Sequence, residues 1–149
     1  MTDPVPQFSR QLHIDAPPDV VFAYFTDPRR MAEWMGIGHR LEAVPGGTFM
    51  VDINGRDVAE GTFVEVDPPR RLVFTWGWRN SLRLPPGATT VEVNLSPDGI
   101  GTLLDFTHHG VPASPEDRHT DGWNHYMARL ALVAAGRPAG PDTFAAIDR

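Results

Sequence analysis

Apolar and polar residues alternate along two neighbouring stretches of the chain, residues 60–66 and 72–78, which an Asp-Pro-Pro connection at 67–69 separates. Side chains of a strand point alternately to the two faces of a sheet. The second stretch therefore places four large apolar groups on one face, namely Leu72, Phe74, Trp76 and Trp78. Such a face requires a cover, and we expect a long helix near the end of the chain to supply it.

The same alternation predicts about seven strands along the chain. They are expected at residues 8–15, 39–44, 48–53, 58–66, 72–78, 89–95 and 102–108. Most connections after residue 39 are short and rich in Pro, Gly, Asn and Asp, which favour tight reversals. The later strands should therefore form an antiparallel meander, in which residues 80–87 are the one longer loop.

Two short helices are expected between the first and second strands. The proline pair at 17–18 suits the first turn of a helix, where the missing backbone N–H costs nothing. Apolar residues within 21–25 then share one helical face. The Asp-Pro pair at 27–28 ends this helix and begins a second one that runs to Trp34.

A longer helix is predicted near the end of the chain. Ser114 suits its cap and Pro115 its first position, while Gly136 ends it. One helical stripe contains His119, Trp123, Tyr126, Met127, Leu130 and Ala134. We expect this stripe to face the sheet. Leu132 points to the opposite side, so it is either a lone exposed leucine or part of a partner contact.

Length and composition narrow the class of protein. The 149 residues favour a single domain over 1–149, with a core at 8–136 and a tail at 137–149. The absence of cysteine and of a signal-like start makes the cytoplasm the expected location. Every apolar run is too short for a membrane span. A net charge of -6 without a basic stripe argues against nucleic-acid binding.

Two histidines are candidates for orienting a ligand or transferring a proton. His108 has the inward parity of its strand, and His119 falls on the helix stripe. The two rings are expected to meet at the mouth of a space between sheet and helix. A structural alternative stays open, in which each histidine hydrogen-bonds to backbone near the end of its element.

Glu60 and Tyr126 complete the candidates for proton transfer. Glu60 shares parity with Val64, and an inward, buried glutamate would be a general base with a raised pKa. A bulge near Gly61 would turn it outward. No set of residues has the spacing of a metal site, and no glycine-rich nucleotide fingerprint is present, so we expect neither metal nor cofactor.

The order of strand, two short helices, six-strand meander and long terminal helix resembles the helix-grip fold of START-like proteins, the SRPBCC superfamily. Narrower landmarks lie at residues 13–18, 27–28, 46–49, 67–76, 101–102, 107–108 and 122–123. With them the chain resembles the family named for the activator of heat-shock protein 90 ATPase, over roughly residues 8–136. The resemblance implies an α+β fold whose curved antiparallel sheet wraps around the terminal helix.

The resemblance also implies a cavity between the sheet and the terminal helix. Candidate ligand-binding residues are Trp34, Phe49, Val51, Phe74, Trp76, Leu104, Phe106, His108, His119, Trp123, Met127 and Leu130. Two interpretations remain open, because the same side chains can surround a ligand-sized space or pack on one another as a solid core.

Three functions follow from these residues and the resemblance. The aromatic face opposed to the helix stripe favours a non-catalytic binder or carrier of a small apolar or aromatic molecule. The second is an enzyme of cyclase, dehydratase or hydrolase type, which requires at least two of the four candidate groups to converge. The third, a co-regulator of a chaperone ATPase, is motivated by the family name alone. A homodimer through sheet edges, Leu132 or the tail is compatible with the class.

Overall fold

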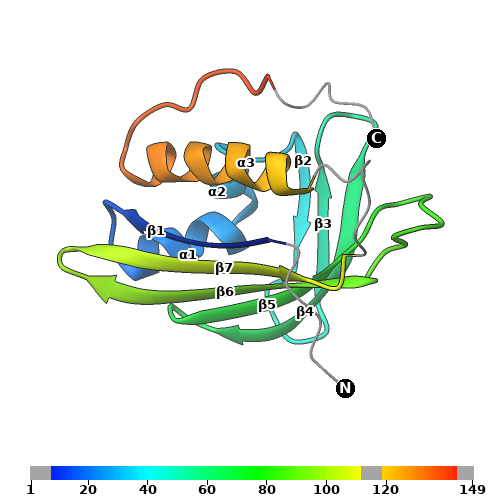
Figure 1. Cartoon of the computed structure of the whole chain (residues 1–149), viewed down its shortest axis with the longest axis horizontal. Helices are drawn as coiled ribbons and strands as arrows, with labels where there is room; N and C mark the ends of the chain where they lie inside the picture. Colours follow the sequence, from blue (N-terminus) through cyan, green and yellow to red (C-terminus); the bar gives the residue numbers. More distant parts are fainter. Residues whose placement is uncertain (1–7, 112–118, 144–149) are drawn as a thin grey trace.

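The computed structural model describes residues 8–111 and 119–143. Its strands are β1 (Phe8–Ile14), β2 (Gly38–Leu41), β3 (Thr48–Asp52), β4 (Val58–Asp67), β5 (Arg71–Trp76), β6 (Thr89–Asp98) and β7 (Gly101–His109). Its helices are α1 (Pro18–Thr26), α2 (Pro28–Met31) and α3 (His119–Ala134). Figure 1 shows α3 and α1 on the same side of the sheet. Each predicted strand is present, with shifted ends.

The seven strands of the described residues form one antiparallel sheet in the order β1-β7-β6-β5-β4-β3-β2. β2 to β7 follow one another as the predicted meander, and β1 pairs with β7. In the last hairpin Asp98 pairs with Gly101, so Gly99 and Ile100 form the turn. Gly99 has φ 64°, a left-handed conformation that glycine adopts at little cost.

The two short helices occupy the chain between β1 and β2. α1 begins at Pro18, and the Asp27 side chain caps α2 by accepting a hydrogen bond from the backbone N–H of Arg29 at 2.9 Å. α2 ends at Met31, earlier than predicted, and turn residues continue the chain to Trp34. The predicted pair of helices is therefore confirmed, with a shorter second member.

α3 lies across one face of the sheet (Figure 1). Its buried residues are Trp123, Tyr126, Met127, Leu130, Val133 and Ala134. The predicted stripe thus faces the core, while Leu132 is 37% exposed on the other side. Gly136, with φ 84°, follows the helix, and Arg137 N–H donates to the Leu132 carbonyl at 2.8 Å. The predicted cap at Ser114 lies outside the described residues.

The segment after α3 turns back over the helix (Figure 1). Arg129 Nη1 donates to the Gly140 carbonyl at 3.0 Å, and Arg129 Nε donates to the Trp34 carbonyl at 3.0 Å. Asp142 accepts from the Tyr126 hydroxyl at 2.6 Å. These charge-assisted hydrogen bonds hold the returning segment against α3. They also hold α3 against Trp34, which follows α2.

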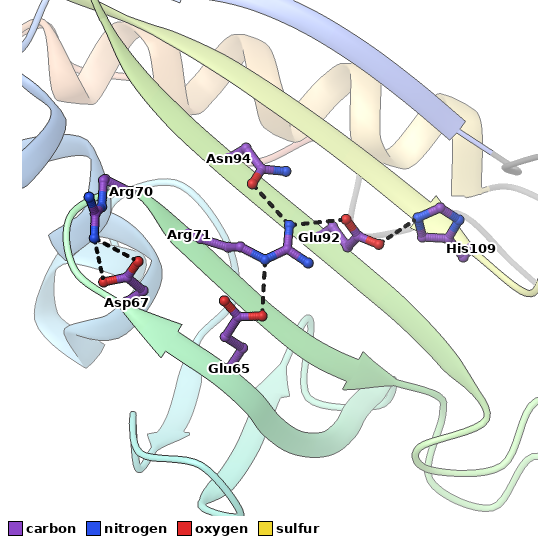
Figure 2. Close-up of polar contacts among 7 residues, drawn as sticks. All are labelled: Glu65, Asp67, Arg70, Arg71, Glu92, Asn94 and His109. Atoms are coloured by element: carbon purple, nitrogen blue, oxygen red, sulfur yellow. Dashed lines mark hydrogen bonds and ion pairs between the residues drawn. The ribbon is translucent and has the colours of Figure 1, made fainter.

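The sheet face away from α3 carries a network of ion pairs (Figure 2). Arg71 donates to Glu65 at 3.0 Å and to Glu92 at 3.3 Å, and His109 lies 3.1 Å from Glu92. Val73 pairs in register with Glu65 and Glu92 and is buried although it faces outward. The charged side chains therefore cover an apolar one, and being partly exposed they add little stability of their own.

Candidate functional site

Aromatic rings from the sheet and from α3 pack directly on each other. Between ring centroids, Trp123 of α3 lies 4.9 Å from Trp76 of β5 and 4.6 Å from Phe106 of β7. Phe49 of β3 stacks on Phe74 of β5 at 4.1 Å. These distances are those of favourable aromatic pairs. At Trp76 and Trp123 the sheet and the helix are therefore in contact through side chains.

The residues expected to line this region lie in one buried core. At most 3% of the surface is exposed in Trp34, Phe49, Val51, Phe74, Trp76, Leu104, Phe106, His108, Trp123, Met127 and Leu130. His119, at the first described position of α3, is partly exposed. Where Trp123 of α3 meets Trp76 and Phe106 of the sheet, this core forms the candidate site.

His108 of β7 is completely buried, and both of its ring nitrogens are hydrogen-bonded to side chains. The Trp123 indole Nε1–H donates to His108 Nδ1 at 3.0 Å. Nε2 must then carry the ring proton, which it donates to Thr89 Oγ1 at 2.8 Å. The Thr89 hydroxyl donates in turn to the Trp76 carbonyl oxygen at 2.6 Å. This chain of bonds fixes the tautomer of His108.

The electrostatic state of His108 follows from the same surroundings. Burial, and then the proximity of His119 and His109, lowers the pKa of His108 from 6.5 to about 3. The ring is therefore neutral at physiological pH, and it has no free nitrogen with which to move a proton. The structural interpretation of His108 fits, although its partners are the side chains of Trp123 and Thr89 rather than backbone groups.

His119 stands beside His108, as strand parity and the helix stripe predict. The two ring centroids are 5.2 Å apart. The Trp78 indole Nε1–H donates to His119 Nε2 at 3.1 Å. One histidine thus receives an indole N–H from the helix and the other receives one from the chain after β5, so each ties the sheet to α3.

Trp76 differs from the other three tryptophans of the chain, whose indole N–H groups all donate to protein acceptors. Trp76 is 3% exposed, and its Nε1 is, within the described part of the chain, the one buried side-chain polar atom without a partner. An unpaired buried donor costs about 1–3 kcal/mol. A bound molecule that carries an acceptor would remove this penalty.

Tyr126 engages the returning C-terminal segment. Its hydroxyl donates to Asp142 Oδ2 at 2.6 Å, and His125 Nε2 lies 2.8 Å from Asp142 Oδ1. Burial, and then the hydrogen bond to Asp142, raises the pKa of Tyr126 above its ordinary value. Tyr126 is therefore a poor proton donor at neutral pH, and its hydroxyl has a structural role.

Of the two directions left open for Glu60, inward or turned outward by a bulge, the structure shows the outward one. Glu60 Oε1 forms an ion pair with Arg79 Nε at 2.9 Å, and its side chain is 30% exposed. Phe63 pairs with Phe74 and Glu65 with Val73, so one residue of β4 is unpaired in a bulge between them. The extra residue reverses the alternation of side chains, so residues before the bulge face the side opposite to the one predicted from Val64 and Val66. Glu60 therefore faces outward.

Two residues of the site region are not singled out by the alternation pattern. Thr89 opens β6 on the same inward parity as Val91 and Val93, and a buried hydroxyl at that position signals a required partner. Arg129 lies off the helix stripe, yet it binds the Trp34 carbonyl oxygen. Its partners are backbone groups, which no residue pattern identifies.

Within residues 8–111 and 119–143, no group of three or more His, Asp or Glu side chains is placed to hold a metal ion. No helix in that part of the chain is both long enough and apolar enough to span a bilayer. The candidate site consists of aromatic rings, two imidazoles and a threonine hydroxyl.

The described residues form a seven-stranded antiparallel sheet that holds a long C-terminal helix on one face, with two short helices after β1. This arrangement defines the helix-grip class of START-like proteins. The chain belongs to the family described as Activator of Hsp90 ATPase homolog 1-like protein, whose family model matches residues 15–135.

Relatives of known sequence or structure agree with this family. The human activator of 90 kDa heat shock protein ATPase homolog 1 is 28% identical over 111 residues, which are 73% of this chain and 31% of the human protein. An AHSA1-like protein from Rhizobium etli is 43% identical with a TM-score of 0.73, covering 97% of this chain and 92% of the other. DynU16, from the dynemicin biosynthetic locus, is 27% identical with a TM-score of 0.74, covering 91% and 50%.

One similar structure bears on the quaternary state. The Aha1 dimer from Colwellia psychrerythraea has a TM-score of 0.74 at 15% identity and covers 91% of this chain and 97% of the other. At this identity the likeness shows the fold alone. A homodimer of the present chain remains a prediction.

Proposed function

We propose that the protein is a non-catalytic binder or carrier of a small, largely apolar or aromatic molecule, held between α3 and the sheet. The observation that carries the proposal is the gathering of three indoles at this region. Trp76 lies 5.3 Å from Trp78 and 4.9 Å from Trp123, between ring centroids. Indole rings offer a large apolar surface for affinity together with an N–H for orientation.

The electrostatics of the region favour an uncharged molecule. His108 is neutral at physiological pH because burial lowers its pKa to about 3. The rings in contact with Trp76 belong to Phe49, Trp78, His108 and Trp123. A charged group placed among them would lose its hydration without gaining an opposite charge, which is costly.

The enzyme alternative has little geometric support. It requires two of the candidate groups to act at one point, but both nitrogens of His108 are hydrogen-bonded within the core. The Tyr126 hydroxyl is bound to Asp142, and Glu60 forms an ion pair with Arg79. These commitments favour binding over proton transfer.

The relatives give separate support. DynU16 belongs to a biosynthetic locus and shares 27% identity over 91% of this chain, which is compatible with a small-molecule role. The human relative favours a second candidate, co-regulation of a heat-shock ATPase, but this chain spans only 31% of its length. We expect no change in the ATPase rate when the protein is added to that ATPase, and a dose-dependent change would favour co-regulation instead.

A ligand screen tests the proposed function. The purified protein is titrated with a library of lipids, polyketides and aromatic compounds while tryptophan emission is followed. We expect a saturable change with some aromatic members, which Trp123→Ala abolishes and Leu132→Ala preserves, because Leu132 lies on the outer side of α3. If no member of the library gives saturable binding, the proposed function is overturned.

A further inference from the structure

Three of the four tryptophan indoles donate to protein acceptors, which are the Tyr24 carbonyl oxygen for Trp34 (2.8 Å), His119 Nε2 for Trp78 (3.1 Å) and His108 Nδ1 for Trp123 (3.0 Å). Trp76 is the fourth, and its Nε1–H has no acceptor although only 3% of the residue is exposed. Nearly all buried polar groups in proteins are paired. The exception therefore requires an explanation.

The surroundings of Trp76 restrict what can pair with it. Its ring neighbours are Phe49 at 5.9 Å, Trp78 at 5.3 Å, His108 at 6.1 Å and Trp123 at 4.9 Å, between centroids. The nitrogens of His108 are already engaged with Thr89 and Trp123. An acceptor must therefore come from outside this group and be attached to a body that packs against aromatic rings.

The charge of that acceptor is restricted as well. An indole N–H is a neutral donor, and none of the rings around it carries a positive charge while His108 is neutral. A carboxylate or phosphate would be desolvated there without a counter-charge, whereas a ketone, quinone or amide oxygen loses much less on burial.

We propose that Trp76 Nε1 is the specificity-determining donor of the site, which selects an uncharged, carbonyl-type oxygen on a flat, unsaturated ligand. This inference rests on the proposed function and names the ligand class of the same site. The acceptor oxygen would lie about 2.9 Å from Nε1, the usual length of such a hydrogen bond. The ring of Trp76 would provide apolar contact, and its N–H would discriminate between ligands with and without an acceptor oxygen.

Two matched probes separate the donor from the apolar surface. Acetylnaphthalene carries a ketone oxygen, and ethylnaphthalene, substituted at the same ring position, has a similar shape without an acceptor. Calorimetric titration of the folded protein should show that the ketone binds about tenfold more tightly than the hydrocarbon. Naphthoate, which presents a carboxylate instead, should bind more weakly than the ketone.

Two variants make the test specific. Trp76→Phe keeps an aromatic ring but removes the N–H, so it should abolish the preference for the ketone while the hydrocarbon still binds. Leu132→Ala is the control, because Leu132 is exposed on the outer side of α3 and its loss should leave the preference intact. Circular dichroism confirms that each variant is folded before it is titrated.

NMR spectroscopy can observe the Trp76 indole N–H directly. In two-dimensional NMR of protein with isotope-labelled indole nitrogens, the Trp76 signal is the one that Trp76→Phe removes. The ketone should shift this signal downfield and leave that of Trp34, which donates to Tyr24, unmoved. The hydrocarbon should not produce the downfield shift.

The outcomes distinguish this inference from the proposed function. Equal affinity for ketone and hydrocarbon, or a ketone preference that survives Trp76→Phe, overturns the inference and leaves binding intact. A Trp76 signal that does not respond to bound ketone means that a retained water satisfies the N–H, and it also overturns the inference. Failure of both naphthalenes to bind, together with a negative ligand screen, overturns the proposed function and the inference with it.

Discussion

Two histidine residues respond to pH in opposite ways, because burial lowers the pKa of His108 while two carboxylates raise the pKa of His13. His108 is held neutral in the core by Trp123 and Thr89. His13 is exposed and lies between two carboxylates, with Nδ1 2.8 Å from Asp98 and Nε2 2.9 Å from Asp15. The buried environment of His108 disfavours the charged imidazolium form, and the carboxylates around His13 favour it.

Acid should destabilise the fold through His108. Its pKa is about 3 in the folded state and 6.5 ordinarily, so between these values the unfolded chain binds the extra proton. The stabilisation is complete above pH 6.5 and is lost as the pH falls toward 3, with a slope of up to about 1.4 kcal/mol per pH unit. Urea unfolding at several pH values measures this slope.

A matched pair of variants isolates the His108 contribution. His108→Gln, which cannot be protonated, should flatten the slope between pH 6 and 4, roughly the interval between the two pKa values. His109→Gln, on the outer face of the same strand, should keep most of the wild-type slope, because burial is the largest cause of the lowered pKa of His108 and His109 the smallest. An equally steep slope in His108→Gln would mean that other groups cause the acid sensitivity.

His13 should show the opposite sign. The hydrogen bond to Asp98, and then that to Asp15, raises the pKa of His13 above 6.5. Its stabilisation is present below the unfolded pKa and is lost as the pH rises through the raised folded value. NMR titration of the His13 ring protons should give a midpoint above 6.5, which Asp98→Asn lowers. A midpoint at or below 6.5 would contradict the two ion pairs.

At the scale of single elements, close backbone approach limits what β4 accepts. An added Cβ at Gly61 would collide with the Thr75 carbonyl of β5, whereas at Gly38 of β2 the nearest atom would be 3.4 Å away. Gly61→Ala should therefore lower the free energy of unfolding by about 1–3 kcal/mol, as other overpacked sites do. Gly38→Ala should change it little, and equal losses in the two variants would refute the steric reason.

Arg129 holds the segment that returns over α3. Arg129 bridges the carbonyl oxygens of Trp34 and Gly140, and the planar guanidinium suits two separate acceptors. Arg129→Lys keeps the charge but not this geometry. It should raise amide hydrogen exchange in residues 137–143, measured by mass spectrometry, without a similar change in β6 and β7. Unchanged exchange in that segment would show that other contacts hold it.

The elements themselves were largely predictable from alternation, and the exceptions have local causes. β6 continues to Asp98 rather than 95, because Pro97 still pairs with Thr102 beside a two-residue turn. β2 ends at Leu41. At the next residue the Glu42 N–H still donates to the Thr48 carbonyl oxygen, but the Thr48 N–H donates to the Glu42 side chain at 3.0 Å and not to its backbone. The bulge in β4 leaves no mark in the sequence, since an apolar residue there is equally compatible with regular alternation.

For the whole molecule, parity and helical periodicity sufficed to bring Trp76, His108 and Trp123 together, because each is fixed by the face of its element. The partners within the site were not predictable. Trp123 donates to His108, whereas Trp76 donates to no protein group within the described residues. Both outcomes depend on side-chain rotamers and on the position of α3 along the sheet. Those are properties of the packed whole, so the candidate site is visible in the sequence but its chemistry is not.

Binding should stabilise the entire fold, because the site draws on β3, β5, β7 and α3 together. A ligand that binds only the folded state, at 100 times its Kd, adds about 2.7 kcal/mol, which for a chain of this size raises Tm by roughly 5–10 °C. Differential scanning fluorimetry with acetylnaphthalene should show this rise in the wild type and lose it in Trp123→Ala. Saturable binding without a rise in Tm would mean that the molecule binds the unfolded chain equally well, as a nonspecific apolar surface would allow. It would then not be held specifically by the packed rings between α3 and the sheet.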